Sequence, residues 1–248
     1  LGPWTAREGR LWIDNDGGHL ELAENPVPGL RISDVSLRGS LSYTGRFRLE
    51  GRAALGLGGY PFGESALALT NDVLGVASRL NLPFGLGGFD MRGAITPQGG
   101  YRLSGEGRLQ LGALPPLAEV SAVLSNQDGE QPLRVRAGVD LGVARARVEG
   151  DLNPDGSLRL TGTQALDLEL ARMGPLQITV TRSADGAVDS RLTGQVSVLG
   201  RTLNDVVLVQ RPDGSLAGTA RLAGLGDAQM TLELGRQGLR GEASAAVD

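Results

Sequence analysis

The sequence predicts an all-β protein built as an extended, repetitive antiparallel sheet. A tight turn followed by alternating polar and apolar residues starts at Ser42, Thr96, Asn153 and Arg211, and the last three starts are 57 and 58 residues apart. A turn that recurs at a near-constant period indicates a repeated β-unit. Alternation of apolar and polar residues with period two dominates the rest of the chain, which is typical of strands with one buried face.

The clearest predicted hairpin lies between residues 35 and 55. Apolar or small residues occupy the odd positions from Val35 to Tyr43, a turn falls at Thr44-Gly45, and the odd positions are again apolar or small from Phe47 to Leu55. Most of the residues between them are Ser, Arg or Glu. We therefore expect a hairpin with one apolar face and one solvated face.

The same alternation predicts further strands in the second half of the chain. They are expected near residues 158–170, 176–180, 192–198 and 230–234, with turns at 154–156, 184–186 and 212–214. Each of these turns has Asp before Gly, and in two of them Pro precedes the Asp, which is the order that turn sterics require.

Two stretches are harder to assign. Residues 56–95 are less regular, with bends expected at 60–63 and 82–85 that each hold a Phe, and short strands near 66–69 and 76–82. Apolar residues in 117–124 have helical spacing, but the strands predicted on both sides favour a strand there too.

Composition limits the classes of function. The 248 residues are 40% apolar but only 4% aromatic, which is low for the core of a compact sandwich. All 24 basic residues are arginine and the net charge is −4, which argues against a nucleic-acid binder. The chain has no cysteine, so disulfides and thiolate chemistry are excluded.

The chain shows no targeting segment and no apolar run of 18 residues. It opens without an initiating Met, so we expect it to be a segment of a longer protein. We treat residues 1–248 as a single elongated repetitive β-domain with an irregular stretch at 56–95.

Motifs that could support catalysis or metal binding are weak. His19 is the only histidine, so neither a Ser-His-Asp triad nor a multi-His metal site is expected. Residues 14–18 (Asp-Asn-Asp-Gly-Gly) look like the start of a calcium loop, but the downstream bidentate Glu is missing and a hairpin turn explains them. Gly63-Glu64-Ser65 lacks the second Gly of a nucleophile elbow. We expect no enzyme activity, no metal and no cofactor.

Charged residues on the solvated faces leave two interpretations open. Arg46, Arg48 and Arg52 share a face, as do Arg134 and Arg136, and Arg145 and Arg147. They could contact anionic headgroups, or they could simply form a solvated strand face that discourages edge-to-edge aggregation. The 28 carboxylates are scattered, and although a glycosidase pair could assemble across the sequence, nothing favours one.

The segments Pro28–Gly39 and Leu199–Leu208 share one phrase: an apolar residue, Ser or Asn, Asp, Val, any residue, then Leu, followed by a hairpin. This cadence resembles the AsmA-like superfamily, and within it the TamB type, over roughly residues 28–55 and 95–248. The resemblance implies an elongated, curled antiparallel sheet, a β-taco or groove, with an apolar concave face. It also implies a periplasmic protein of diderm bacteria, anchored in the inner membrane and involved in moving phospholipid or assembling the outer membrane.

Taken together, these features predict a non-enzymatic protein of the periplasm or cell envelope that binds or conducts phospholipid acyl chains along a hydrophobic groove. Envelope membrane proteins are the expected protein partners, nucleic acid is not expected, and the oligomeric state is left open. The residues expected to line the groove are Leu37, Leu41, Phe47, Leu49, Leu103, Leu158, Leu160, Leu192 and Val196. The alternative is a structural or adhesive surface protein, a β-sandwich or β-solenoid with a dry core; a carbohydrate-active jelly roll ranks third.

Overall fold

The computed structural model describes residues 9–14, 17–22, 29–112, 114, 117–127, 133–140, 145–168, 171–198, 201–213, 215–222, 228–235 and 238–244. Within them the fold is all-β, as predicted. The elements are β1 (Gly9–Asp14), β2 (Gly17–Leu22), β3 (Leu30–Leu41), β4 (Phe47–Leu57), β5 (Tyr60–Thr70), β6 (Leu74–Asn81), the 3-10 turn η1 (Pro83–Gly85), β7 (Gly87–Ile95), β8 (Tyr101–Leu109), β9 (Ala118–Ser125), β10 (Leu133–Asp140), β11 (Arg145–Leu152), β12 (Leu158–Leu168), β13 (Ala171–Arg182), β14 (Val188–Val198), β15 (Arg201–Gln210), β16 (Leu216–Leu222), β17 (Gln229–Gly235) and β18 (Gly238–Ser244).

The strands β3 to β18 form one 16-stranded antiparallel sheet in which every strand lies beside its neighbours in sequence. β1 and β2 form a separate two-stranded hairpin that contacts β3. Short hairpin connections explain this order, because they place consecutive strands side by side.

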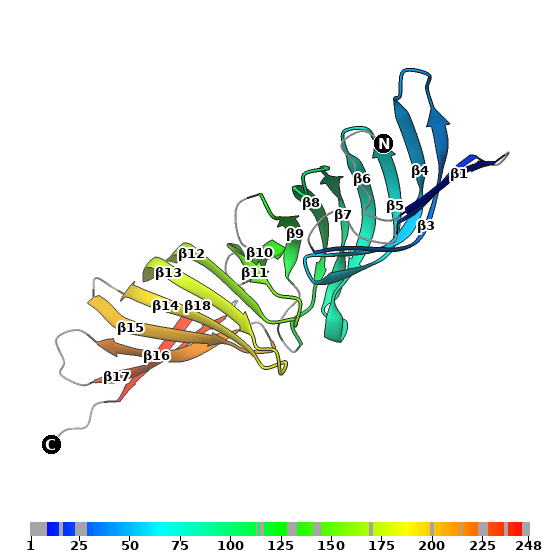
Figure 1. The fold of residues 1–248 in the computed structure, drawn as a ribbon. Coiled ribbons are helices and arrows are strands. Elements are labelled where there is room, and N and C mark those ends of the chain that lie inside the picture. Colours follow the sequence, from blue (N-terminus) through cyan, green and yellow to red (C-terminus); the bar gives the residue numbers. More distant parts are fainter. Residues whose placement is uncertain are drawn as a thin grey trace. The chain divides into compact units, whose positions relative to one another are not determined.

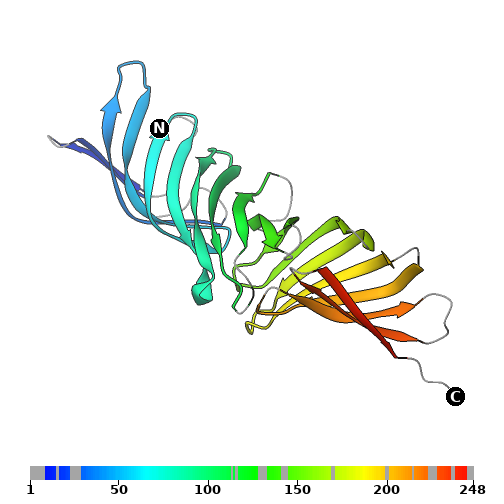
Figure 2. The same ribbon diagram turned by 180° about the vertical axis from the view of Figure 1, so that it is seen from behind.

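The chain divides into two compact units. Unit 1 comprises Leu1–Pro83, Gly87–Gly107 and Ser121–Leu133; unit 2 comprises Phe84–Leu86, Arg108–Val120 and Arg134–Asp248. Figure 1 shows the strands of each unit side by side and curving along their length, for example β4–β7 in unit 1 and β12–β17 in unit 2. Figure 2 shows the same strands from behind.

Four of the predicted turns are present and share one geometry, and the glycine of the fifth, at 212–214, lies outside the described residues. The amide N–H of Gly45, Gly99, Gly156 and Gly186 donates to the carbonyl oxygen three residues earlier, at 2.9 to 3.0 Å. All four glycines have positive φ, between 76° and 94°. Glycine adopts this left-handed backbone without steric cost, which is why the turn signal in the sequence located these hairpins correctly.

Some local expectations were wrong. Residues 56–95, expected to be less regular, contain the end of β4 and the strands β5, β6 and β7, and the bend expected at 82–85 is present as the turn η1. Tyr60 and Phe62 belong to strand β5 and are buried, whereas Phe84 lies in the turn η1 with positive φ and is 70% exposed. Tyr43, expected on the apolar face, lies fully exposed in the turn after β3. Residues 118–125 form strand β9, as favoured.

Along the strands from β4 to β17, side chains buried on one face of the sheet alternate with more exposed ones. In β4, for example, Phe47, Leu49, Ala53, Leu55 and Leu57 are at most 6% exposed. The other face is charged and solvated, so apolar burial drives the sheet to curl around its own inner face.

Interior glycines allow the strands to bend sharply. Gly93 has the same parity as the buried Met91 and Ile95, and a Cβ atom at this position would overlap the carbonyl oxygen of Arg102 on the next strand. Eight more glycines have such an overlap with backbone: Gly39, Gly51, Gly88, Gly105, Gly107, Gly150, Gly162 and Gly218. At these positions the neighbouring backbone crosses too close for any side chain, as at the corners of curled sheets.

An acidic residue with positive φ lies in each of three strands that are six apart in the order of the sheet. Asp34 in β3, Glu119 in β9 and Asp205 in β15 have φ between 48° and 55°. The strand register shifts next to Asp34 and Asp205. Bulges of this kind increase bend and twist. The phrase shared by residues 28–39 and 199–208 therefore has a local structural meaning.

The first prediction concerns the interior glycines. Gly93→Ala should lower the free energy of unfolding by about 1–3 kcal/mol, because the new methyl group must displace the backbone of the next strand. Gly75→Ala is the matched control: its Cβ would lie 3.5 Å from the carbonyl oxygen of Ala68, an ordinary contact, so its effect should stay within about 0.5 kcal/mol. Urea denaturation measures both. Equal effects would contradict the role assigned to Gly93.

The second prediction concerns pH. The hydroxyl and backbone N–H of Ser157 donate to Asp155, and those of Ser215 donate to Asp213, which lowers the pKa of both turn carboxyls. Because these pKa values are lower in the folded state, the carboxylates stabilise the fold at pH above their ordinary value. That contribution is lost as the pH falls through the lowered value.

The double variant Asp155→Asn, Asp213→Asn should therefore lose stability less steeply below about pH 4 than the parent. The measurement is the urea midpoint as a function of pH. Parallel curves for variant and parent would refute the assignment.

Candidate functional site

The residues predicted to line a groove all lie in strands and face the interior wherever their side chains are described. Leu37, Phe47, Leu49 and Leu103 belong to unit 1, and Leu158, Leu160, Leu192 and Val196 belong to unit 2. Their exposed fractions are 0 to 6%. Leu41 lies in β3, but its side chain is outside the described part of the structure. The interior is thus closed by side chains in this structure.

The strand register shows which of these residues are neighbours. In unit 2, Leu192 of β14 lies opposite Ile178 of β13 and Leu208 of β15. In unit 1, Leu49 of β4 lies opposite Leu69 of β5. Each unit therefore has its own continuous apolar interior built from adjacent strands.

Sequence reasoning missed several interior residues. Tyr60, Phe89, Met91 and Tyr101 are at most 2% exposed. Phe89 and Met91 alternate with Asp90 and Arg92, so the period-two signal was present in the stretch that we expected to be irregular.

The sheet has two rims where its hairpins lie. We define the first rim as the one that contains the β4–β5 hairpin, and the second rim as the one that contains the β3–β4 hairpin. Because the strands alternate in direction, hairpins fall on the two rims in turn. Three contacts join the first rim to the second rim five or six strands further on, and we call them clasps.

The clasp of unit 1 joins Tyr60 to Leu133. Tyr60 begins β5 at the first rim, and its hydroxyl oxygen accepts a hydrogen bond of 3.4 Å from the backbone N–H of Leu133, which begins β10 at the second rim. The two residues are 73 positions apart in sequence. The sheet of unit 1 is therefore curled until its rims meet.

Unit 2 has a clasp around Arg182. Its buried guanidinium donates to the carbonyl oxygens of Gly156 (2.7 Å) and Ser183 (3.3 Å), and lies 5.3 Å from the ring centre of Phe84. Phe84 comes from the β6–β7 hairpin at the first rim, whereas Gly156 and Arg182 lie at the second rim. Contact with a ring face stabilises a guanidinium that burial has removed from water.

The second clasp of unit 2 depends on Gln210. Its Nε2 donates to the carbonyl oxygen of Asp140 at 2.9 Å, and its Oε1 accepts from the buried hydroxyl of Ser190 at 3.2 Å. Asp140 ends β10 at the first rim and Gln210 ends β15 at the second, 70 positions later. Each clasp is formed by side chains; among the described residues no ladder of backbone hydrogen bonds joins the two rims.

A hollow lies beside the clasp of unit 1. It has a volume of about 500 Å³ and is lined by residues of β3, β4 and β5, among them Leu55, Leu57, Tyr60, Arg31 and Ser33. Apolar side chains and a guanidinium therefore share one opening at the rim where the curl closes.

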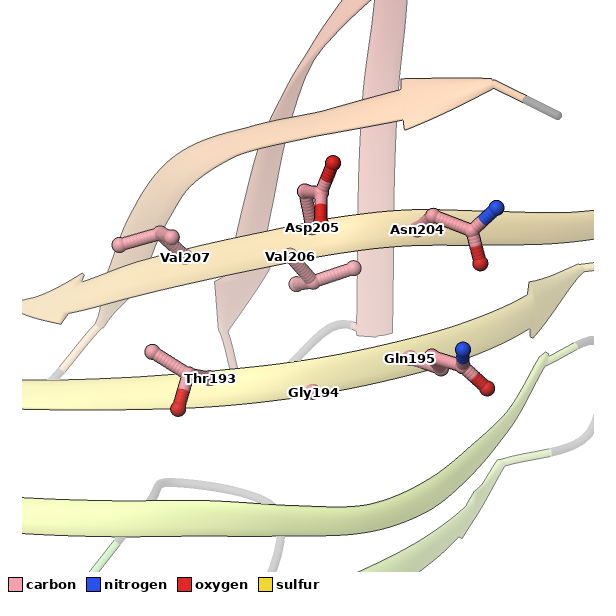
Figure 3. A pocket seen from close by; sticks show the side chains of 7 residues that line it. All are labelled: Thr193, Gly194, Gln195, Asn204, Asp205, Val206 and Val207. Atoms are coloured by element: carbon pink, nitrogen blue, oxygen red, sulfur yellow. The ribbon is translucent and has the colours of Figure 1, made fainter.

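A second hollow, of about 690 Å³, lies over the bulge between β14 and β15. Figure 3 shows Thr193 and Gln195 on β14 and Asn204, Asp205 and Val207 on β15. Most of its lining is polar. The Oδ2 atom of Asp205 lies 3.9 Å from the Nε atom of Arg221. This arrangement follows from the register shift of the bulge, and it offers one carboxylate rather than a pair.

Several arginines of the solvated face are in ion pairs. Arg48 pairs with Glu50, and Arg52 with Glu64, at 2.6 and 3.0 Å. Arg136 and Arg145 pair with Glu149 and Glu119. All of these side chains are more than half exposed, so each pair contributes little to stability. These ion pairs fit the interpretation that the arginines belong to a solvated strand face, which needs no contact with a lipid headgroup.

The other motifs considered in the sequence form no reactive site. Ser65 is buried in β5 and donates to Ser78 and to the carbonyl of Gly63. His19 lies opposite Trp12 in the β1–β2 hairpin, and the segment 14–18 falls partly outside the described residues.

The described residues contain no group of three or more His, Cys, Asp or Glu side chains placed to hold a metal ion. In the same residues no helix has the length and apolar character needed to cross a membrane.

Comparison with known proteins leaves the family open. No protein-family model, no curated protein and no solved structure matches the chain.

The third prediction concerns the Gln210 clasp. Gln210→Leu should lower the free energy of unfolding by about 1–3 kcal/mol, because it removes two hydrogen bonds and leaves the Ser190 hydroxyl buried without this acceptor. Amide hydrogen exchange should accelerate most at the ends of β10 and β15. Gln177→Leu, on the exposed side of β13, is the matched control and should stay within about 0.5 kcal/mol. Equal exchange in both variants would show that the clasp does not hold the rims together.

Proposed function

We propose that this protein binds phospholipid acyl chains on the apolar inner face of its curled sheet, as a non-enzymatic component of the periplasm or cell envelope. In this proposal the chain conducts acyl chains along the sheet and shields them from water, in line with the AsmA-like resemblance of its sequence. The observation that supports the proposal best is that each unit has an apolar interior whose rims are joined by side-chain clasps.

The inner face has no second sheet layer made from the described residues. Outside the 16-stranded sheet lie only the β1–β2 hairpin and the turn η1. The side chains of the inner face therefore cover one another across the curl. An acyl chain has the same chemistry as these Leu, Val and Phe side chains, so it can replace contacts that they make with each other.

The clasps give this interior a route of entry. A closed barrel opens only by breaking a ladder of backbone hydrogen bonds, whereas the rims here separate when a few side-chain contacts break. In unit 1 the clasp residue Tyr60 also lines the 500 Å³ hollow. Arg31 in the same hollow could pair with the phosphate of a lipid whose chain enters beside Tyr60.

The free energy of transferring an acyl chain into the interior is compatible with transport. Each methylene kept out of water stabilises the complex by roughly 0.8 kcal/mol, so a chain of a dozen methylenes gains about 10 kcal/mol relative to water. Relative to a bilayer, which is equally apolar, the transfer is close to neutral. A lipid can therefore enter and leave without a chemical step.

The low exposure of the interior favours a second candidate. Leu160, Leu192 and Val196 are fully buried, as expected of a structural or adhesive protein with a dry core. In that case the clasps stay closed and no ligand enters the interior.

The fourth prediction separates the two candidates. The purified protein is incubated with a phosphatidylcholine that carries a diazirine in its acyl chain, irradiated, digested and analysed by mass spectrometry. We expect labels on interior residues such as Leu160 and Leu192, and not on their outward-facing neighbours Arg159 and Arg191. Each interior residue thus has a control on the same peptide.

A water-soluble diazirine without an acyl chain gives the background for this experiment. The acyl-chain proposal would be contradicted if labelling by the lipid does not exceed this background, or if it favours the outward-facing residues. Either result would support the dry core.

A further inference from the structure

The interior of unit 1 contains one polar atom that nothing in the described structure satisfies. Tyr101, the first residue of β8, is 0% exposed, and its hydroxyl oxygen has no hydrogen-bond partner. Among the described residues it is the only buried side-chain polar atom in this condition. A buried hydroxyl without a partner lowers stability, and phenylalanine would fill the same space without that cost.

The backbone of Tyr101 is held firmly in place. Its N–H donates to Oδ1 of Asn126 at 2.7 Å, and its carbonyl accepts from the N–H of Asn126 at 3.3 Å. The Asn126 amide also donates to the carbonyl of Gly99 at 2.8 Å. These three bonds fix the start of β8, so the ring cannot reach solvent by a shift of its own strand.

Tyr101 lies close in the sheet to the clasp of unit 1. Tyr101 begins β8 and Leu133 begins β10, two strands further along the second rim. The hydroxyl of Tyr60 reaches Leu133 from the first rim. The unsatisfied phenol is thus placed near the point where the curl of unit 1 would open for a guest.

The chemistry of the site defines the ligand. Desolvation by burial raises the pKa of Tyr101, so the phenol stays neutral and keeps its proton at neutral pH. A neutral hydroxyl in apolar surroundings can donate one hydrogen bond to an oxygen that carries negative charge or a strong dipole. An acyl ligand has such an oxygen at its head end: the carboxylate of a fatty acid or the ester carbonyl of a phospholipid.

We propose that the Tyr101 hydroxyl binds the head-end carbonyl or carboxylate oxygen of an acyl ligand whose chain lies in the interior of unit 1. This inference rests on the proposed function and adds a specific positioning residue to it. Leu, Phe and Met side chains would hold the hydrocarbon by burial alone, and Tyr101 would fix the position of its polar end.

The fifth prediction uses three probes and two variants. Dodecanoic acid carries a carboxylate, a short-chain phosphatidylcholine carries ester carbonyls, and dodecane carries no acceptor. Tyr101→Phe should weaken binding of an acceptor-bearing probe by about tenfold and leave dodecane binding unchanged. Whichever acceptor probe responds identifies the ligand source. Tyr43→Phe is the control, because Tyr43 lies fully exposed in the turn after β3 and its hydroxyl faces solvent.

Infrared spectroscopy gives a second readout that a purely structural role would not move. With probe labelled by ¹³C at the carbonyl, the wild-type complex should show a lower carbonyl stretching frequency than the Tyr101→Phe complex. Thermal unfolding should show that Tyr101→Phe folds at least as stably as the wild type, since it loses only an unsatisfied group.

The outcomes separate the two proposals. Equal affinity and equal carbonyl frequency in wild type and Tyr101→Phe would overturn the role of Tyr101 while leaving acyl binding intact. A wild-type protein that binds none of the three probes would overturn both. A high-resolution structure in which an ordered water alone satisfies the Tyr101 hydroxyl, with ligand bound elsewhere, would also refute the assignment.

Discussion

Close approach of neighbouring backbones on the inner face is the constraint on which this structure depends. Where Gly93 faces Arg102, or Gly150 faces Arg159, the next strand passes so near that no Cβ atom could fit. Strands that bend this sharply turn their apolar side chains toward one another. The sheet consequently buries its inner face without a helix or a second sheet, and the glycine content reflects that bending.

The curl produces both the closed interior and its weak points. The rims meet through Tyr60 and Gln210, whose polar groups bond to backbone atoms of the opposite rim, and through Arg182, whose guanidinium contacts the ring of Phe84 on the opposite rim. A few side-chain contacts are easier to break than a ladder of backbone hydrogen bonds. Separating the two rims therefore costs less free energy than opening a closed barrel. An acyl-binding protein and a protein with a dry core can therefore have the same architecture. The free energy needed to separate the rims determines which of the two this protein is.

Much of the fold was predictable because its signals are local. The turns at 42–45, 96–99 and 153–156 need glycine at a left-handed position, and their sequences identified them correctly. Alternation identified interior residues such as Leu103 and Leu160. The same approach failed at Tyr43, where alternation was extended into a turn, and at 60–63, where similarity to 82–85 suggested a bend in what is a strand.

Taken alone, the sequence determined which residues form strands and turns and which side chains share a face, because backbone sterics and period-two geometry act over a few residues. Only the tertiary structure decided how far the sheet curls, which rims meet, and that the buried Tyr101 hydroxyl has no partner among the described residues. The clasps of Tyr60 and Gln210 join positions 73 and 70 apart. Contacts over such distances depend on the summed bend of five strands, and no local pattern of residues encodes that sum.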